Sequence, residues 1–370
     1  MSVSDRSFED FLRNAGWADA ERIPLTGDAS TRRYIRLRRG DQTALLMDQP
    51  QGAEAPTAAA NATPEERKAL GYNAVARLAG ADCGRFVAAA NYLHSLGLSA
   101  PEIYDADAPN GYVLMEDLGA DLFTDSLAKG VSERALYEGA AEVLARIHAH
   151  AAPAVLPPDK PLHAYDETAL MAEVDLLTEW FFPVGLGRAA TADEISEFHG
   201  LWREALAPVL ATRPVFVHRD YHAQNLMWMP GRDGAARVGL IDFQDGVAGS
   251  PAYDMISLVE DARRDVSAET GKLTLSHYLN KMQEQGTPVD EAAFALEMAV
   301  YAAQRNTKIV GIFARLFRRD GKARYLDLLP RVWSYLNNDL AHPALSGLKS
   351  WYDRTIPFAA RGVPDIGSKR

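Results

Sequence analysis

The segment from His218 to Asn225 constrains what this chain can fold into more than any other part of the sequence. It reads HRDYHAQN, and Asp242 opens an Asp-Phe-Gln triplet seventeen residues after Asn225. Short apolar runs precede both pieces, VFV before the first and VGLI before the second. Such runs, bounded by polar residues and a turn, are typical of strands. The two stretches VFVHRDYHAQNLMW and ARVGLIDFQDG, separated by a turn around Pro230 to Gly234, therefore predict a short strand pair with polar residues at its ends.

The spacing of these polar residues indicates phosphoryl-transfer chemistry. In the pattern H-R-D-x-x-x-x-N, the Asp faces an acceptor hydroxyl and the Asn ligates a metal. A phosphoryl group in transfer spreads negative charge over its oxygens, so oxygen ligands must hold Mg²⁺ against the phosphates and a carboxylate must orient the hydroxyl. We therefore assign Asp220 as the candidate catalytic residue and Asn225 and Asp242 as candidate Mg²⁺ ligands. His218 directly follows VFV and is assigned a structural role.

Two other interpretations of this segment are weaker. Asp and Asn also favour turns beside buried strands, but that does not account for the whole octapeptide together with Asp242. His218 and His222 have the spacing of half a zinc site. A zinc protease needs Glu after the first His, and Arg219 stands there.

A second motif, GLGRAA at 185–190, matches the residue pattern of a dinucleotide-binding loop. Pro183 precedes it, and strands do not alternate with helices around it, as that site requires. We expect a turn between two helices instead.

The order of expected elements divides the chain near Leu118. Residues 21–48 read as strands with a turn at Gly40, and 49–66 as a loop. A helix is expected over 85–96, followed by two strands, after which the chain is mostly helical. We therefore predict an N-lobe over 1–118 that covers a nucleotide and a C-lobe over 119–370 with the catalytic loop, metal site and substrate-binding helices.

Charge and composition exclude several classes of protein. The chain has 39 Lys and Arg against 50 Asp and Glu, a net charge of -11 that argues against a nucleic-acid partner. A lone cysteine, Cys83, cannot form an internal disulfide. The start MSVSDRSFED lacks a secretion signal, and no apolar run is long enough to span a membrane. We expect a cytoplasmic protein without a membrane or obligate protein partner.

The N-lobe offers two candidate nucleotide contacts. The small polar turn between the first two strands can cover phosphates with backbone amides and short hydroxyls, and it consists of Gly27, Asp28, Ala29, Ser30 and Thr31. The segment 113–119, with Met115 and Asp117, is the candidate inter-lobe hinge, whose backbone can bind an adenine edge. A hairpin turn and an ordinary strand end explain these two segments equally well.

Together these motifs resemble the aminoglycoside phosphotransferase and choline kinase superfamily, and within it the bacterial N-acetylmuramate/N-acetylglucosamine anomeric kinases of cell-wall recycling. The segments that carry the resemblance are GDASTRRYIRL, LMEDLG, EVDLLTEWF, HRDYHAQNLMW, GLIDFQDGVAGSPAYDMISLVEDAR and GIFARLFRRDGKARYL. The resemblance covers nearly the whole chain. The resemblance implies an α+β, protein-kinase-like two-lobed fold with a small β-rich N-lobe and a larger, mostly helical C-lobe. It also implies that Asp254, in SPAYD, is a buried residue that braces the catalytic loop.

One departure from kinase sites concerns the phosphates. A lysine on the third strand normally pairs with a glutamate on the next helix. Here the strand reads ALLMD, and 85–96 contains no acidic residue. Either an arginine, Arg32 or Arg33, takes over the phosphate contact, or metal and backbone hold the nucleotide.

The acceptor side is less clearly marked. Glu173 and Trp180 lie on one expected helix, where a carboxylate can bind sugar hydroxyls and an indole can stack on a sugar ring, although core Trp is equally common. Between 305 and 324 the chain has seven basic residues against one acid, Asp320. This segment is either a solvated helix face or an anion site, for instance for a lactyl carboxylate, with Arg305 and Lys308 as the candidates.

We therefore predict an ATP- and Mg²⁺-dependent kinase acting on the anomeric hydroxyl of N-acetylmuramate, N-acetylglucosamine or a close relative. The sugar class follows from the resemblance alone. The alternatives are another aminoglycoside- or choline-type phosphotransferase, and a non-catalytic nucleotide-binding protein with a kinase fold.

Overall fold

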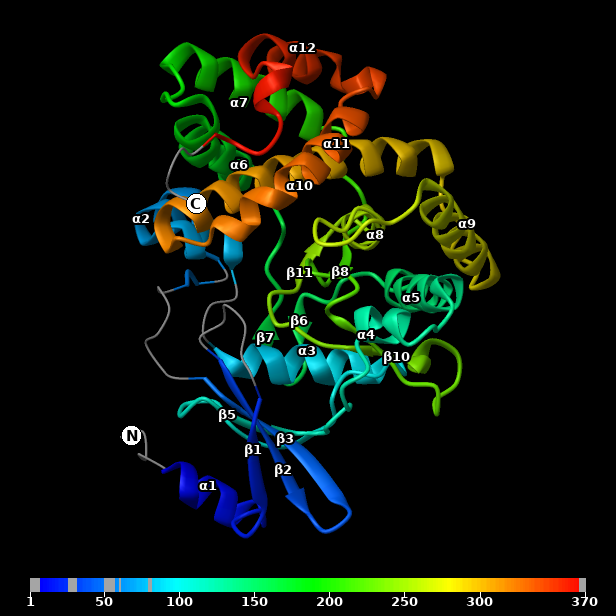
Figure 1. Ribbon diagram of the computed structural model, residues 1–370. Coiled ribbons are helices and arrows are strands. Elements are labelled where there is room, and N and C mark those ends of the chain that lie inside the picture. The colour runs from blue at the N-terminus through cyan, green and yellow to red at the C-terminus, as the bar shows by residue number, and fades with distance from the viewer. Residues whose placement is uncertain (1–6, 26–31, 50–56, 60, 79–81, 366–370) are drawn as a thin grey trace.

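We describe the chain from a computed structural model, over residues 7–25, 32–49, 57–59, 61–78 and 82–365. Figure 1 shows a small sheet at one end of the molecule and a larger, mostly helical part at the other. This arrangement confirms the predicted α+β, two-lobed fold.

The small sheet is antiparallel throughout, with the strand order β1-β2-β3-β5-β4. Its strands are β1 (Glu21–Pro24), β2 (Arg33–Arg39), β3 (Gln42–Asp48), β4 (Ile103–Asp107) and β5 (Tyr112–Met115). The turn between β2 and β3 places Gly40 at φ +57°, a backbone conformation that favours glycine. The predicted hairpin with its turn at Gly40 is confirmed.

Helices cover both faces of this sheet. Side chains alternate along a strand, so Leu46 packs with Phe11 of α1 (Phe8–Asn14), whereas its neighbour Met47 joins the main core. That core also contains the buried side of α3 (Cys83–Ser95). The helix predicted over 85–96 is confirmed.

A short helical segment leaves the sheet and packs on the helical part. It comprises α2 (Pro64–Leu70) and η1 (Asn73–Arg77), and η1 contacts α6 (Glu167–Leu176). A capping box starts α2, with the Thr63 hydroxyl accepting from the Glu66 amide and the Glu66 carboxylate accepting from the Thr63 amide. The loop expected over 49–66 is therefore wrong at its last three residues. This segment precedes Leu118 in sequence but lies beside helices that follow it (Figure 1).

Ten helices make up most of the described chain after Leu118. They are α4 (Phe123–Ala128), α5 (Glu133–His148), α6, η2 (Leu177–Leu186), α7 (Ala192–Leu206), α8 (Ala252–Val259), α9 (Ala268–Glu284), α10 (Glu291–Asp320), α11 (Leu329–Asp339) and α12 (Ser346–Thr355). Short 3₁₀ turns lie at η3 (Gly234–Arg237), η4 (Ala323–Leu328), η5 (Pro343–Leu345) and η6 (Phe358–Ala360). Within the residues described, no helix has the length and apolarity needed to cross a membrane.

The helix α10 organises this part, since it contacts α6, η2, α8 and α11. Gly311 allows the close approach, because a Cβ there would lie 2.3 Å from the carbonyl carbon of Leu176. The junction of α6 and η2 therefore sits directly on α10. The motif at 185–190 ends η2 and precedes α7, with Gly187 left-handed, so the predicted turn between two helices is confirmed.

Six very short strands complete the helical part. They are β6 (Val155–Leu156), β7 (Lys160–Pro161), β8 (Val215–Val217), β9 (Leu226–Trp228), β10 (Val238–Leu240) and β11 (Val247–Gly249). They pair as β6–β7, β9–β10 and β8–β11. The two segments with the motif residues connect the pairs β8–β11 and β9–β10. Residues 218–225 link β8 to β9, and residues 241–246 link β10 to β11.

Candidate active site

Two antiparallel strand pairs bring the parts of the catalytic motif together. In β9–β10 Leu226 is opposite Leu240, so Asn225 and Asp242 lie at the same end of this pair. In β8–β11 Val217 is opposite Val247, so the loop that begins at His218 lies beside the segment that precedes β11. The Ile241 amide also donates to the Asn225 carbonyl over 3.2 Å. Residues separated by seventeen or more positions therefore form one polar surface.

Asp220 is exposed on this surface. Burial of its surroundings opposes ionisation, but His222, Lys308 and Arg219 together lower the pKa of Asp220 to about 2. Asp220 is therefore a carboxylate at neutral pH, able to accept a hydrogen bond from a hydroxyl group. Its low basicity suits orientation of that hydroxyl better than early removal of its proton.

Asp254 and His218 hold the loop that carries Asp220. The Asp254 carboxylate accepts from the amides of His218 at 2.6 Å and Arg219 at 2.9 Å. The latter has φ +76°, a strained conformation for a residue with a side chain. Burial raises the pKa of Asp254 to about 7, while the two amides act in the opposite direction. This aspartate therefore anchors the two backbone amides that lead into the strained Arg219.

The His218 side chain is fully buried. Its Nε2 lies 3.0 Å from the Ile241 carbonyl, and since a carbonyl only accepts, Nε2 is the protonated nitrogen. The imidazole thus ties the catalytic loop to the residue before Asp242 and cannot reach a substrate.

The candidate metal ligands each carry a side-chain oxygen, and both residues lie at the same end of β9–β10. The Asn225 Nδ2 donates to the Asp220 carbonyl over 2.9 Å, which leaves the Asn225 Oδ1 for another partner. Asp242 has φ +62° and a side chain that is 44% exposed, and its Oδ1 accepts from Gln244 at 2.8 Å. An amide and a carboxylate oxygen are ligands that Mg²⁺ accepts. In the described ranges no three His, Cys, Asp or Glu residues cluster as a metal site, so a bound ion would need further ligands from phosphates and water.

The candidate nucleotide contacts have different outcomes. The turn Gly27 to Thr31 lies outside the described residues. Arg32 is buried, and its Nη1 lies 3.3 Å from the Asp242 Oδ1. It therefore approaches the candidate metal site, whereas Arg33 is exposed on β2.

The candidate hinge is fixed by side chains. Met115 ends β5 and is buried. The Asp117 carboxylate accepts from Arg36 on β2 and from the Gly119 amide at 3.0 Å. The Asp117 side chain therefore ties the hinge to the sheet, so only the hinge backbone is left to contact an adenine edge.

Glu173 was predicted to bind the acceptor, and its surroundings contradict that role. Its side chain is 1% exposed and accepts from Arg219 at 2.7 Å and Lys308 at 3.3 Å through Oε1. Its Oε2 accepts from the Tyr165 hydroxyl and from Gln304. Burial raises the pKa of Glu173, but Lys308 and Arg219 outweigh this and lower it overall. Glu173 is a buried counterion with no oxygen left for a sugar.

Arg305 is also misassigned as an acceptor ligand. It is 4% exposed and donates to the Glu260 carbonyl at 3.2 Å and the Ser257 hydroxyl at 3.0 Å. These bonds tie α10 to the end of α8, so Arg305 has a structural role. The spacing of basic residues cannot reveal which of them face inward.

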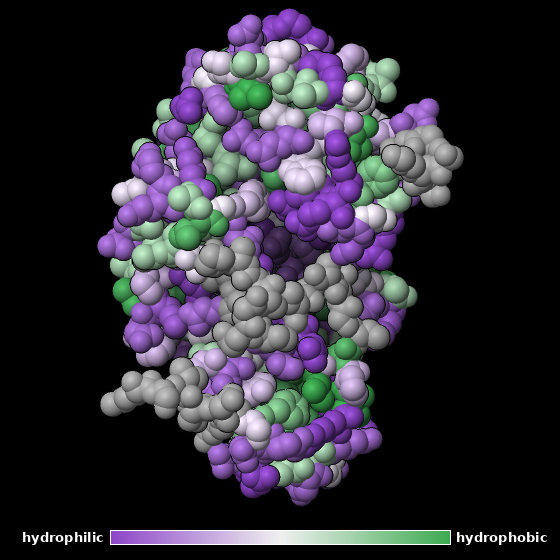
Figure 2. All heavy atoms as spheres, turned by 90° about the vertical axis from the view of Figure 1, so that its left-hand side faces the viewer, coloured by the Kyte–Doolittle hydropathy of each residue, from purple (hydrophilic) through white to green (hydrophobic). Residues whose placement is uncertain are grey.

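The other two acceptor candidates keep some exposure. Lys308 is 13% exposed, donates to the Tyr253 hydroxyl at 2.5 Å, and contributes positive charge at Asp220. Trp180 lies in η2, partly buried against the main core. Figure 2 shows a hollow lined by hydrophilic atoms on the face that carries α2. The hollow lies between the level of α10 and the level of the small sheet.

Some contacts of the site cannot be predicted from the sequence. Arg219 stands within the motif, but its buried pairing with Glu173 joins positions 46 residues apart. Arg219 also donates to the Arg77 carbonyl at 2.9 Å, and Arg77 pairs with Asp245 at 3.2 Å. These contacts join η1 to the catalytic loop, and no local pattern in the sequence signals them.

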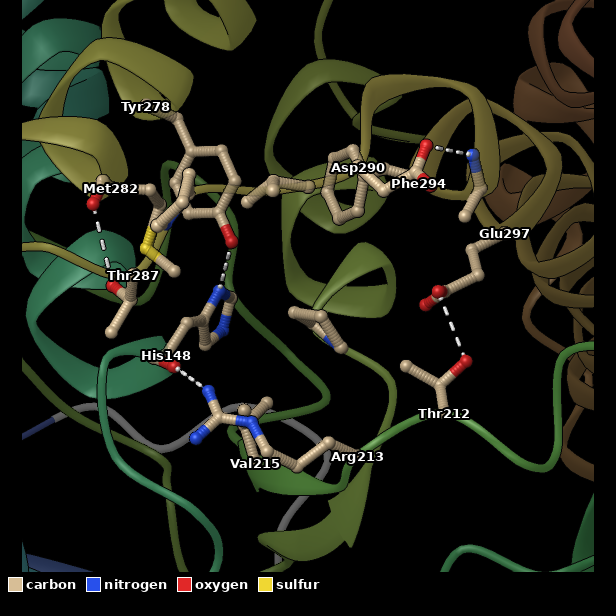
Figure 3. A pocket seen from close by; sticks show the side chains of 14 residues that line it. His148, Thr212, Arg213, Val215, Tyr278, Met282, Thr287, Asp290, Phe294 and Glu297 are labelled. Carbon is tan, nitrogen blue, oxygen red and sulfur yellow. Dashed lines mark hydrogen bonds between the residues drawn. The ribbon is translucent and has the colours of Figure 1, made fainter.

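A separate cavity of about 380 Å³ lies in the helical part, and none of the predicted site residues lines it. Figure 3 shows the Tyr278 hydroxyl directed at His148, with Nδ1 and hydroxyl oxygen 3.0 Å apart, and Arg213 donating to the His148 carbonyl. Burial, aided by Arg213, lowers the pKa of His148 to about 3. A neutral histidine therefore lines this cavity at physiological pH.

Comparison with known proteins places these observations in a family. Residues 21–289 match the phosphotransferase enzyme family. An N-acetylmuramate/N-acetylglucosamine kinase of Caulobacter vibrioides is 45% identical over 95% of this chain and 96% of its own length. A protein of the same name from Pseudomonas aeruginosa is 32% identical over 90% and 89% of the two chains.

Solved structures share the fold at low sequence identity. The ADP-bound aminoglycoside phosphotransferase APH(2'')-Ib has a TM-score of 0.53 at 15% identity, covering 89% of this chain and 97% of its own. The choline kinase of Cryptosporidium parvum has a TM-score of 0.53 at 15% identity, covering 93% and 98%. Both likenesses concern the fold.

Proposed function

Because the chain belongs to the phosphotransferase enzyme family, we propose that it transfers the γ-phosphoryl group of ATP to the anomeric hydroxyl of N-acetylmuramate or N-acetylglucosamine. The near full-length similarity to curated kinases of these sugars supports the choice of acceptor. Cell-wall recycling supplies such free amino sugars, and the cytoplasm supplies ATP. We therefore propose that the reaction takes place in the cytoplasm.

The observation that carries the proposal is the position of Asp220. It is exposed and ionised, on a loop whose backbone Asp254 holds from beneath. An anomeric hydroxyl is more acidic than an ordinary alcohol, so it needs a carboxylate that orients it and accepts its proton late. Asp220, with its low pKa, fits that requirement.

Mg²⁺ is the proposed cofactor beside ATP. Asn225 and Asp242 would hold it through their side-chain oxygens, and the fit rests on the free Asn225 Oδ1 and the exposed Asp242 carboxylate. When bound, the ion would neutralise charge on the β- and γ-phosphates. Lys308 and the partly compensated Arg219 add positive charge near Asp220.

Arg32 is the proposed substitute for the missing strand lysine. It is buried and lies 3.3 Å from Asp242, so its guanidinium is close to where phosphates must meet the metal ligands. A guanidinium can bind two phosphate oxygens at once. Arg33 does not share this position, since it is exposed.

A substrate panel tests the function. The protein is incubated with Mg²⁺, ATP and one acceptor at a time, and ADP release is followed with N-acetylmuramate, N-acetylglucosamine, kanamycin or choline. We expect kcat/KM for the amino sugars to exceed the other values by about 10²-fold or more. A preference for kanamycin or choline would assign a different acceptor, and ATP binding without transfer to any acceptor would indicate a non-catalytic protein.

A further inference from the structure

One face of α10 carries two cations, Lys308 and Arg315, and the first of them acts on Asp220. Lys308 and Arg315 are seven residues apart, which is two turns, so they lie on the same face about 10 Å apart along the axis. Lys308 already contributes positive charge at Asp220. Side chains of a helix lean toward its N-terminus, so Arg315 leans back toward Lys308.

Tyr72 connects these cations to the segment between α2 and η1. The Arg315 guanidinium lies over the Tyr72 ring, 4.7 Å from its centre. Burial raises the pKa of Tyr72 to about 12 and Glu173 adds to this, while Lys308, Arg315 and Arg219 act against it. The phenol therefore faces the same cluster of charges that surrounds Asp220.

Among the residues that the structure describes, Arg315 differs from its basic neighbours because no acidic side chain pairs with its charge. Lys308 and Arg219 share Glu173, and Arg305 donates to Ser257 and a carbonyl. Within the described ranges, the buried Nε of Arg315 has no hydrogen-bond partner and no carboxylate lies within salt-bridge distance of the guanidinium. A buried donor without a partner is costly, which indicates that a ligand completes it.

Acidic groups near Arg315 do not fill this role. Burial raises the pKa of Glu179 on η2, Asp175 adds to this, and Trp180 and Arg315 act against it. Asp320, five residues further along α10, is already paired with Arg319. A guanidinium stacked on an aromatic ring keeps its edge available for two parallel bonds to a carboxylate.

We infer that Arg315, held over Tyr72, binds the carboxylate of an acidic acceptor sugar while Asp220 receives its reacting hydroxyl. This inference rests on the proposed function and makes Arg315 a specificity residue. The two sugars named for the relatives differ in this respect, since N-acetylmuramate carries a lactyl carboxylate and N-acetylglucosamine does not. Arg315 therefore favours the acidic sugar and leaves the neutral one unaffected.

The test compares both sugars in Arg315→Gln, Arg315→Lys and a control, Arg318→Gln, an exposed arginine on the same helix. We expect Arg315→Gln to raise KM for N-acetylmuramate about 10- to 100-fold, the range for charged hydrogen bonds, and to change kinetics with N-acetylglucosamine less than about twofold. Arg315→Lys should fall between, and Arg318→Gln should match wild type. Equal losses with both sugars would assign Arg315 a structural role and overturn the inference.

Calorimetric titration separates this inference from the proposed function, because binding does not require transfer. N-acetylmuramate should bind the wild type more tightly than Arg315→Gln, even if the wild type were to phosphorylate neither sugar. In that case the function would be wrong and the carboxylate site would stand. Equal affinities in the two proteins would refute the site.

Discussion

The Arg219 guanidinium donates to the Glu173 carboxylate over 2.7 Å, with side chains only 8% and 1% exposed. The pair lies beneath the catalytic loop, one residue from Asp220. Because Lys308 shares the same carboxylate oxygen, one buried acid balances two cations near the reacting group. The electrostatics of the site therefore depend on a carboxylate that is buried beneath it.

The first prediction concerns this counterion. Glu173→Gln removes the charge that balances Arg219 and Lys308 and should lower the free energy of unfolding by about 3–5 kcal/mol, as when one partner of a buried pair is lost. The control Glu167→Gln, on the exposed side of the same helix, should cost less than about 1 kcal/mol. Urea denaturation measures both. A stable Glu173→Gln protein with a raised sugar KM would restore Glu173 as an acceptor ligand.

The second prediction concerns Asp220. Asp220→Asn keeps the shape of this exposed side chain but removes its charge, so kcat should fall by about 10² to 10⁴ while the melting temperature stays near wild type. Asp233→Asn, at a fully exposed surface acid, serves as control and should retain full activity. Steady-state kinetics and thermal melts provide the two readouts. Near wild-type kcat in Asp220→Asn would remove Asp220 from the mechanism.

The third prediction separates two adjacent arginines. Arg32→Ala should raise the KM for ATP at least about tenfold, because a buried guanidinium beside Asp242 is lost. Arg33→Ala alters an exposed residue of the same strand region and should change the KM less than about twofold. If ATP binding depends on Arg33 or on neither residue, the phosphates are held in another way.

The fourth prediction concerns His148 and pH. Its folded pKa of about 3 lies below the ordinary value near 6.5, so below pH 6.5 the unfolded chain takes up a proton that the folded protein does not. Stability from this group is complete above pH 6.5 and falls as pH drops toward 3, by about 1.4 kcal/mol per unit. Between pH 7.5 and 5.0, the wild type should lose about 2 kcal/mol more than His148→Gln.

Urea denaturation at the two pH values tests this difference. His163 and His222 also have pKa values lowered by burial to about 4, but they are present in both proteins and cancel in the comparison. Equal pH dependence of the wild type and His148→Gln would show that His148 is not held neutral.

Local sequence patterns were sufficient to predict individual elements of the fold and the segments of the candidate site. The turn at Gly40, the helix that ends before Gly97 and the strand pair β9–β10 each depend on neighbouring residues, and the structure contains all three. The family likeness then supplied the arrangement of the lobes. The geometry of a motif with fixed spacing can be predicted from the sequence, because a short chain segment determines it.

The residues that bind the acceptor could not be predicted from the sequence, because their positions depend on contacts between distant segments. The Glu173 side chain faces the core because it pairs with Arg219 and with Lys308 on α10. Lys308 is more than 130 residues away from Glu173 in the sequence. The change from α6 to the π-helical η2 also alters which face Trp180 presents relative to Glu173. A helical pattern with a single period could not include that change.

The most direct test of the account is the identity of the product. Wild-type protein is incubated with ATP, Mg²⁺ and N-acetylmuramate, and the product is analysed by ¹H–³¹P correlation NMR. We expect a phosphorus resonance correlated with the anomeric proton of the sugar. Correlation with protons at another carbon of the ring, or consumption of ATP without a sugar phosphate, would contradict it.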